Sequence, residues 1–121
     1  MKSKLLVVDD SGLARRAMRS ILESDGYVVV EATDGMTALE QYFLEKPDAV
    51  MLDLVMSGMY GLEVLEKLRQ LDPAARIIVV SADVQSSSQQ MVAEAGASAF
   101  ITKPVDRQQL LAVVQRVLET A

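Results

Sequence analysis

Five short apolar segments, separated by segments with helical spacing, constrain the fold of this chain more than any other feature of its sequence. Each is rich in β-branched residues and hardly alternates between apolar and polar positions, which is typical of strands buried on both faces of a sheet. The segments are KLLVV (4–8), YVVVEA (27–32), AVML (49–52), RIIVV (76–80) and AFIT (99–102). We therefore predict five strands that need covering on both sides.

The intervening segments have the spacing of amphipathic helices. Apolar residues recur three and four positions apart after the first strand, over 14–22, and after the last strand, over 110–118. Asp106 and Gln109 form a capping-box pattern before this last helix. The serine-rich stretch 85–90 is the weakest helix former, so we expect a loosely held helix near 84–95. Turns and helix ends are marked by Asp25-Gly26, Asp34-Gly35, Ala95-Gly96, Pro47 and Pro73.

Strict alternation of strands and helices predicts an α/β fold. Parallel strands with right-handed helical crossovers give a doubly wound (βα)5 domain, a flavodoxin-like three-layer sandwich with a five-stranded parallel sheet in the order 2-1-3-4-5. The 121 residues suffice for one core, and no linker, repeat or low-complexity tract divides them. We expect a single domain over 1–121.

Composition excludes several classes of site and partner. The chain has no cysteine and no histidine, so a bound metal must be held by oxygen ligands. A net charge of -5 argues against direct binding to nucleic acid and favours a protein partner or a small anion. No apolar run approaches the roughly 20 residues of a membrane span, and the start MKSKLLVVDD lacks the apolar core of a signal peptide. We expect a cytoplasmic protein without membrane insertion.

Polar residues stand after four of the predicted strands and near the end of the second. They are Asp9-Asp10, Glu31, Asp53, Ser81 and Lys103. Ligands of such sheets bind outside the carboxyl ends of the strands. In the order 2-1-3-4-5 the first, third, fourth and fifth strands are consecutive, so all of these residues except Glu31 are expected to face one crevice.

Three carboxylates at one place predict a divalent cation, because each would otherwise raise the pKa of its neighbours. Mg²⁺ (or Mn²⁺ in its place) suits Asp10, Asp53 and a backbone carbonyl just after Asp53, that of Val55. Lys103 supplies a positive charge for a phosphoryl oxygen and Ser81 a hydroxyl donor. An ionised Asp53 could then attack phosphorus and form an aspartyl phosphate.

Each of these residues also has a common structural explanation. Asp9, Asp10 or Ser11 could be the N-cap of the first helix, Ser81 could be a turn residue, and Lys103 could form an ordinary ion pair at a strand end. Taken singly, these explanations are the better ones. Polar groups at four strand ends that meet in space favour a site.

The chain resembles the response-regulator receiver domain of two-component signalling from end to end. The resemblance lies in five motifs in the right order and spacing, LLVVDDS, EATDGMTAL, AVMLDLVMSGMYGLE, IIVVSA and AGASAFITKP. It implies Asp53 as phosphoacceptor, Asp9 and Asp10 as the acidic pair that holds Mg²⁺, and Lys103 as the cationic partner of the phosphoryl group. It also implies Ser81 and Phe100 as switch residues; Phe100 could equally be a core aromatic.

The resemblance further implies a mechanism and partners. A sensor histidine kinase or phosphotransfer protein would donate the phosphoryl group, and the chain would catalyse only its own phosphorylation and dephosphorylation. Phosphorylation would draw Ser81 toward the new oxygens and remodel the face of the fourth helix, the fifth strand (99–102) and the last helix, which would bind a target protein. Ser98-Ala99 before that strand favours a stand-alone monomer of the chemotaxis type, with dimerisation on phosphorylation as an alternative.

Departures from the family pattern border the expected site. Ser57 replaces the usual Pro, which should loosen the loop, and Tyr60 replaces an acidic or amide residue, which leaves an exposed aromatic for a partner. Val55 and Asp83 occupy positions that tune dephosphorylation in the family.

Two other functions compete with a stand-alone receiver. One is the receiver fragment of a longer regulator, although no basic helix-turn-helix is present. The other is a small phosphatase with Asp53 as covalent nucleophile, but such hydrolases generally need a second Asp two residues later, where this chain has Val55.

Overall fold

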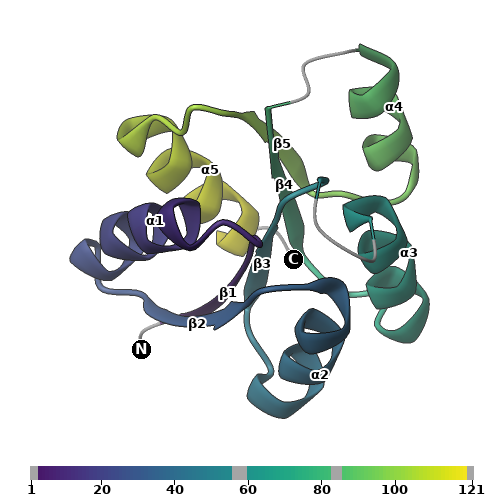
Figure 1. Cartoon of the computed structure of the whole chain (residues 1–121), viewed down its shortest axis with the longest axis horizontal. Coiled ribbons are helices and arrows are strands. Elements are labelled where there is room, and N and C mark those ends of the chain that lie inside the picture. The colour runs from purple at the N-terminus through teal and green to yellow at the C-terminus, as the bar shows by residue number, and fades with distance from the viewer. Residues whose placement is uncertain (1–2, 56–59, 83–85, 120–121) are drawn as a thin grey trace.

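The computed structural model of the protein describes residues 3–55, 60–82 and 86–119, with side chains in the last segment from Ser88 onward. These residues form a parallel sheet of five strands in the order β2-β1-β3-β4-β5, with a helix after each strand (Figure 1). The strands are β1 (Lys4–Val8), β2 (Val28–Ala32), β3 (Ala49–Leu52), β4 (Ile77–Ser81) and β5 (Ala99–Thr102). The helices are α1 (Gly12–Ser24), α2 (Gly35–Glu45), α3 (Gly61–Leu71), α4 (Ser86–Glu94) and α5 (Arg107–Glu119). The predicted strand order and fold class are confirmed.

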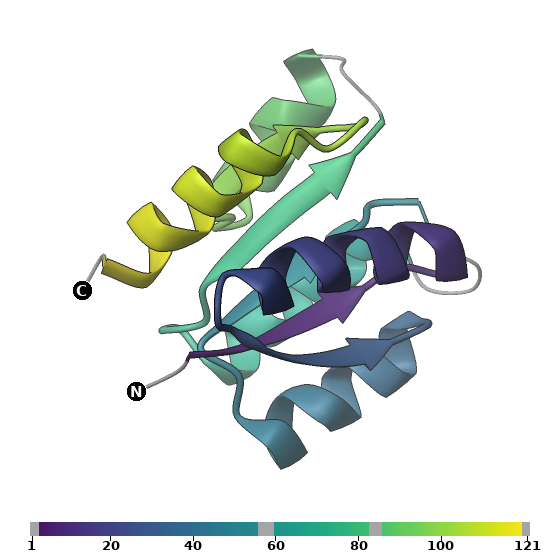
Figure 2. The ribbon, with the colours of Figure 1, turned by 90° about the vertical axis from the view of Figure 1, so that its left-hand side faces the viewer.

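Helices cover both faces of the sheet, which makes three layers. Met18 and Leu22 of α1 pack with residues of α5 on one face, where Leu5 and Val7 point. Helices α2, α3 and α4 cover the other face, and they contribute buried residues such as Leu65 and Val92. Figure 2 shows α1 and α5 in front of the strands.

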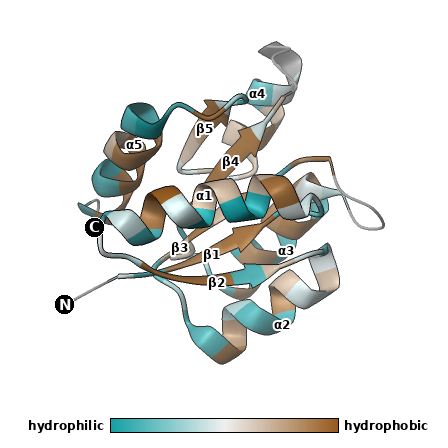
Figure 3. Ribbon diagram, turned by 60° about the vertical axis from the view of Figure 1, so that its left-hand side comes forward, coloured by the Kyte–Doolittle hydropathy of each residue, from teal (hydrophilic) through white to brown (hydrophobic). Residues whose placement is uncertain are grey.

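Burial along the strands follows their place in the sheet. Every residue of β3 and β4 is buried, and so is every residue of β1 after Lys4. The edge strands β2 and β5 are partly exposed, since each has a neighbour on one side only. The apolar core strands stand out against helices of mixed hydropathy in Figure 3.

Several of the residues predicted to mark turns and helix ends do lie at the ends of helices. Asp34 is the N-cap of α2 and accepts a hydrogen bond from the backbone N–H of Thr37 at 2.8 Å. Asp106 accepts in the same way from the N–H of Gln109, also at 2.8 Å, before α5. Gly26 and Gly96 follow α1 and α4 with φ of 94° and 100°, in the left-handed region that glycine enters without strain.

None of the helices in the described segments has the length and apolar character that crossing a bilayer would require.

Candidate functional site

Backbone hydrogen bonds continue the sheet by one residue beyond three of its strands, and these three residues are polar. The N–H of Asp9 donates to the carbonyl of Ala32 at 3.2 Å, and that of Asp53 donates to Val8 at 3.0 Å. The N–H of Lys103 donates to the carbonyl of Ser81 at 2.9 Å. The side chains that follow β1, β3 and β5 are therefore fixed by the sheet itself.

The structure brings the three predicted carboxylates together. Oxygens of Asp9, Asp10 and Asp53 all lie within 4.8 Å of one another. Asp9 is fully buried and Asp53 is 7 % exposed, whereas Asp10 lies in solvent. The cluster therefore has a buried floor and one open side, through which a small ion or a phosphoryl group can enter.

Lys103 is the cation of this cluster. Its Nζ lies 2.8 Å from Oδ2 of Asp9 and 3.6 Å from Oδ2 of Asp53. Burial alone would lower the pKa of Lys103, but the hydrogen bond to Asp9 and the negative charge of Asp53 outweigh it and raise that pKa. The ammonium therefore stays charged and balances part of the acidic cluster.

The surroundings of Asp53 raise its pKa when no metal is bound. Burial raises the pKa of Asp53, the charges of Asp9 and Asp10 add to this effect, and Lys103 opposes it. The N–H of Val55 also opposes it, donating to Oδ1 of Asp53 at 3.4 Å. A divalent cation would reverse the balance by stabilising the ionised carboxylate.

The chemistry of these donors fits a hard divalent ion. Clustered carboxylate oxygens with an open side match the preference of Mg²⁺ for a few protein oxygens with water completing its shell. The carboxylate group of Asp9, Asp10 and Asp53 is one that could hold a metal, as predicted.

The structural explanations considered above are resolved in part. Ser11 is the N-cap of α1 and accepts from the N–H of Ala14 at 3.2 Å, so neither Asp10 nor Asp9 has that role. Asp9 instead accepts from the N–H of Ser11 at 2.9 Å. Ser81 is the last residue of β4, fully buried and paired with Thr102, and is not a turn residue.

Phe100 lies in β5 beside Val79 of β4. It is partly buried and packs against the cluster that includes Val92 of α4. This position fits a core aromatic, and it also fits a switch residue, because the ring packs against a cluster to which α4 contributes.

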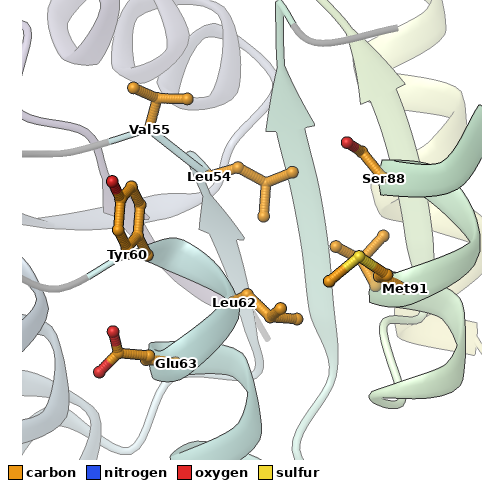
Figure 4. A pocket seen from close by; sticks show the side chains of 8 residues that line it. Leu54, Val55, Tyr60, Leu62, Glu63, Ser88 and Met91 are labelled. Carbon is orange, nitrogen blue, oxygen red and sulfur yellow. The ribbon is translucent and has the colours of Figure 1, made fainter. Parts of the chain in front are cut away.

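An apolar groove borders the site (Figure 4). Its volume is about 400 Å³, and Val55 and Tyr60 lie at its rim, 64 % and 63 % exposed. The lining residues are Leu54, Val55, Tyr60, Leu62, Glu63, Ser88, Met91 and Val92. Of the four noted positions beside the site, Ser57 and Asp83 lie outside the described residues.

Gly61 brings the start of α3 against the site, a contact that its place in the sequence did not reveal. A Cβ built on Gly61 would lie 2.2 Å from the carbonyl oxygen of Asp53 and 2.6 Å from Cα of Leu54. Its N–H donates to the carbonyl of Leu54 at 2.9 Å. Helix α3 therefore begins directly against the backbone of Asp53, an approach that only glycine permits.

Arg15 and Glu31 form an ion pair beside the site that the sequence did not reveal. Glu31 lies on edge strand β2 and is not one of the three clustered carboxylates. It accepts from Nε of Arg15 at 2.9 Å, and Arg15 also donates to the backbone carbonyl of Asp9 at 2.7 Å. The sequence places Arg15 in the first helix, but it does not show that its guanidinium contacts Glu31 and the carbonyl of Asp9.

Comparisons with known proteins identify the family. The family described as "Response regulator receiver domain" matches residues 5–115. The chain is 37 % identical to the chemotaxis protein CheY of Bacillus subtilis, covering 98 % of this chain and 99 % of that protein. It is 36 % identical to response regulator MprA of Mycobacterium ulcerans, covering 98 % of this chain and 51 % of that protein.

A solved structure gives the same result for the fold. The CheX-CheY-BeF3-Mg+2 complex from Borrelia burgdorferi contains a chain that superposes with a TM-score of 0.93 at 31 % identity, covering 98 % of this chain and 90 % of that one. Sequence match, fold and carboxylate cluster agree. The chain belongs to the response regulator receiver family, a family of signalling modules.

Proposed function

We propose that this protein is a single receiver domain over 1–121 that accepts a phosphoryl group on Asp53 from the histidine of a sensor kinase or phosphotransfer protein. The observation that carries this proposal is the pairing of a buried Asp53 with Lys103 at 3.6 Å inside a cluster of three carboxylates. A buried carboxylate at a strand end, aimed at an open crevice with a cation beside it, can act as a nucleophile toward phosphorus.

The chemistry is a displacement at phosphorus. A carboxylate oxygen of Asp53 forms the new O–P bond while the P–N bond of the donor breaks and its electron pair leaves with the imidazole nitrogen. Lys103 stabilises negative charge on the transferred group, because its ammonium already lies between Asp9 and Asp53. The rigid backbone of β3 and Gly61 orients the nucleophile.

Asp10, Asp53 and the carbonyl of Val55 would hold Mg²⁺, with Asp9 beside them. When bound, the ion offsets the repulsion between the carboxylates and the incoming phosphoryl oxygens. The CheX-CheY-BeF3-Mg+2 complex from Borrelia burgdorferi supports this assignment, because it contains both BeF3 and Mg. Mn²⁺ is the expected substitute.

We further propose that Ser81 and Phe100 transmit the state of Asp53. Ser81 is buried at the end of β4, next to the strand that carries Phe100, so a shift of Ser81 toward a phosphoryl group would free space for the ring. The face of α4, β5 and α5 would then bind a target protein. A cytoplasmic location and a monomeric state rest on the resemblance and stay predictions.

Two other functions were considered from the sequence, a receiver within a longer regulator and a small phosphatase. A role as the receiver part of a longer regulator is compatible with the match to half of MprA. A small phosphatase is disfavoured, because Val55, at the position where such hydrolases need a second carboxylate, has a hydrocarbon side chain that cannot transfer a proton.

Intact mass spectrometry after incubation with acetyl phosphate tests the proposal. The native chain should gain one phosphoryl group when Mg²⁺ is present and none when it is chelated, and the Asp53→Asn variant should gain none. An adduct that persists in the variant, or the absence of any adduct in the native chain with Mg²⁺, would contradict the assignment.

A further inference from the structure

Two arginines of α1 bind the same carboxylate, but only one of them reaches the site. Glu31 accepts from Nε of Arg15 at 2.9 Å and is also paired with Arg19, which in turn pairs with Glu23 at 3.1 Å. The pKa of Glu31 is lowered, first by the hydrogen bond from Arg19 and, against the effect of burial, also by that from Arg15. Glu31 is therefore a charged anchor point on β2.

From this anchor Arg15 extends to the peptide group that joins the two acidic residues. Its second nitrogen donates to the backbone carbonyl of Asp9 at 2.7 Å, and that carbonyl belongs to the peptide leading into Asp10. The rest of Asp9 is held elsewhere, its N–H by Ala32 and its carboxylate by Ser11 and Lys103. The bond from Arg15 fixes the remaining polar group of Asp9.

We propose that Arg15, anchored by Glu31, is a positioning residue that sets the orientation of the Asp9-Asp10 peptide and so of the Asp10 carboxylate that holds the metal. This inference rests on the proposed function, since it concerns Mg²⁺ binding by Asp10. The guanidinium suits the role because its planar fork can bind a carboxylate and a carbonyl at once, whereas an ammonium is a single point charge.

The direction in which the Mg²⁺ affinity changes when Arg15 is replaced separates a positioning role from a purely electrostatic one. Arg15 carries a positive charge close to a cation site, so by charge alone its removal should tighten Mg²⁺ binding. If Arg15 positions Asp10, its removal should weaken binding, as loss of a group that orients metal ligands commonly does, by about tenfold or more.

The experiment is a Mg²⁺ titration of the native protein, Arg15→Gln and Arg19→Gln, followed by backbone amide shifts in NMR spectra. Arg19→Gln is the matched control, because it removes the same charge from the same helix and the same carboxylate but no bond to Asp9. We expect about a tenfold loss of affinity for Arg15→Gln, and affinity within about twofold of native for Arg19→Gln. In the metal-free spectra the Asp10 amide should shift in Arg15→Gln only.

Thermal unfolding of the metal-free variants gives the second readout. A purely structural role of Arg15 would lower the melting temperature with Mg²⁺ affinity unchanged, and this result, or tighter binding by Arg15→Gln, would overturn the proposal. If Arg15→Gln does not fold, Arg15→Lys decides: it keeps the charge and loses the fork, so weaker binding is expected and native binding would refute the role.

A native chain that binds no Mg²⁺ would overturn the proposed function and with it the role given to Arg15. If the native chain binds Mg²⁺ and Arg15→Gln binds it with the same affinity, only the role given to Arg15 is overturned.

Discussion

Gly61 and Gly12 begin helices α3 and α1, but their surroundings differ. An added Cβ on Gly61 would meet the backbone of Asp53 and Leu54, which cannot move without displacing the Asp53 side chain. On Gly12 it would lie 3.1 Å from a guanidinium nitrogen of Arg16, the far end of a flexible side chain. We expect Gly61→Ala to lower the free energy of unfolding by about 1 to 3 kcal/mol, and Gly12→Ala to be neutral or stabilising by up to about 1 kcal/mol.

Denaturant unfolding of the two variants checks this difference. The rate of phosphorylation by acetyl phosphate should also fall in Gly61→Ala, because Asp53 moves. Equal stabilities of the two variants would show that the start of α3 can withdraw from β3 without cost.

Tyr60 is the N-cap of α3 and makes no side-chain capping hydrogen bond. Since it is largely exposed at the groove, its replacement removes little packing. We expect Tyr60→Ser to raise the free energy of unfolding by about 1 kcal/mol, because a serine hydroxyl can accept from an N–H of the first turn.

Ser11→Ala is the mirror of this variant. Ser11 caps α1 through the N–H of Ala14, so its loss should destabilise the protein by about the same amount. Chemical denaturation of both variants gives the comparison, and a destabilised Tyr60→Ser would mean that the tyrosine contributes packing that outweighs a cap.

Asp53 should make the metal-free protein less stable at neutral pH. Its pKa is raised in the folded state, chiefly by burial, while the unfolded chain has the ordinary value near about 3.9. Between the two values the folded state binds more protons, so stability falls as pH rises through this window, and the loss persists above it. Asp53→Asn lacks this loss and should unfold at a higher temperature than the native protein at pH 7.

Thermal unfolding with chelator over pH 3 to 8 measures the effect. The advantage of Asp53→Asn should shrink toward the acid end, and it should shrink or reverse for the native protein in Mg²⁺, which stabilises the ionised carboxylate. A native protein that is as stable as the variant throughout would contradict the electrostatic description of the site.

At the scale of elements, α4 and α5 differ in how they are held. Among the side chains described for α4, from Ser88 on, Val92 is the buried one, whereas α5 buries Leu110, Val114 and Val117. Few buried contacts allow local opening, so we expect α4 amides to exchange with solvent at least about tenfold faster than those of α5. Hydrogen exchange followed by mass spectrometry measures this, and equal protection would remove the main physical reason for assigning α4 to the switch.

The bounds of strands were predicted correctly where the apolar run and the backbone pairing end at the same residue. The buried strands β1 and β3 have the predicted bounds, because their apolar runs end where the sheet ends. The apolar pattern predicts that the fourth strand ends before Ser81, but the backbone of Ser81 still pairs with Thr102. Backbone pairing between strands can continue past the last apolar residue, because it does not depend on the side chain. Tyr27 was predicted in β2, but its N–H bonds to Leu22 at the end of α1.

At the scale of the whole molecule, the alternation of strands and helices determined the topology and hence which strand ends meet. That is why the approach of Asp9, Asp53 and Lys103 to one another could be predicted from sequence. The contact of Arg15 with Asp9 and the approach of Gly61 to Asp53 could not, because helical spacing gives the face of a residue and not the atoms opposite it.

The ion pair between Asp9 and Lys103 joins residues 94 positions apart, which directly follow the first strand and the last. During synthesis Asp9 is added long before Lys103, and at roughly 5 to 20 residues per second the interval lasts about 5 to 20 seconds. Throughout that time the aspartates lack the ammonium of Lys103. Under the proposed function, a new chain therefore has an incomplete site until its last strand has been made, and translation delays the appearance of complete sites.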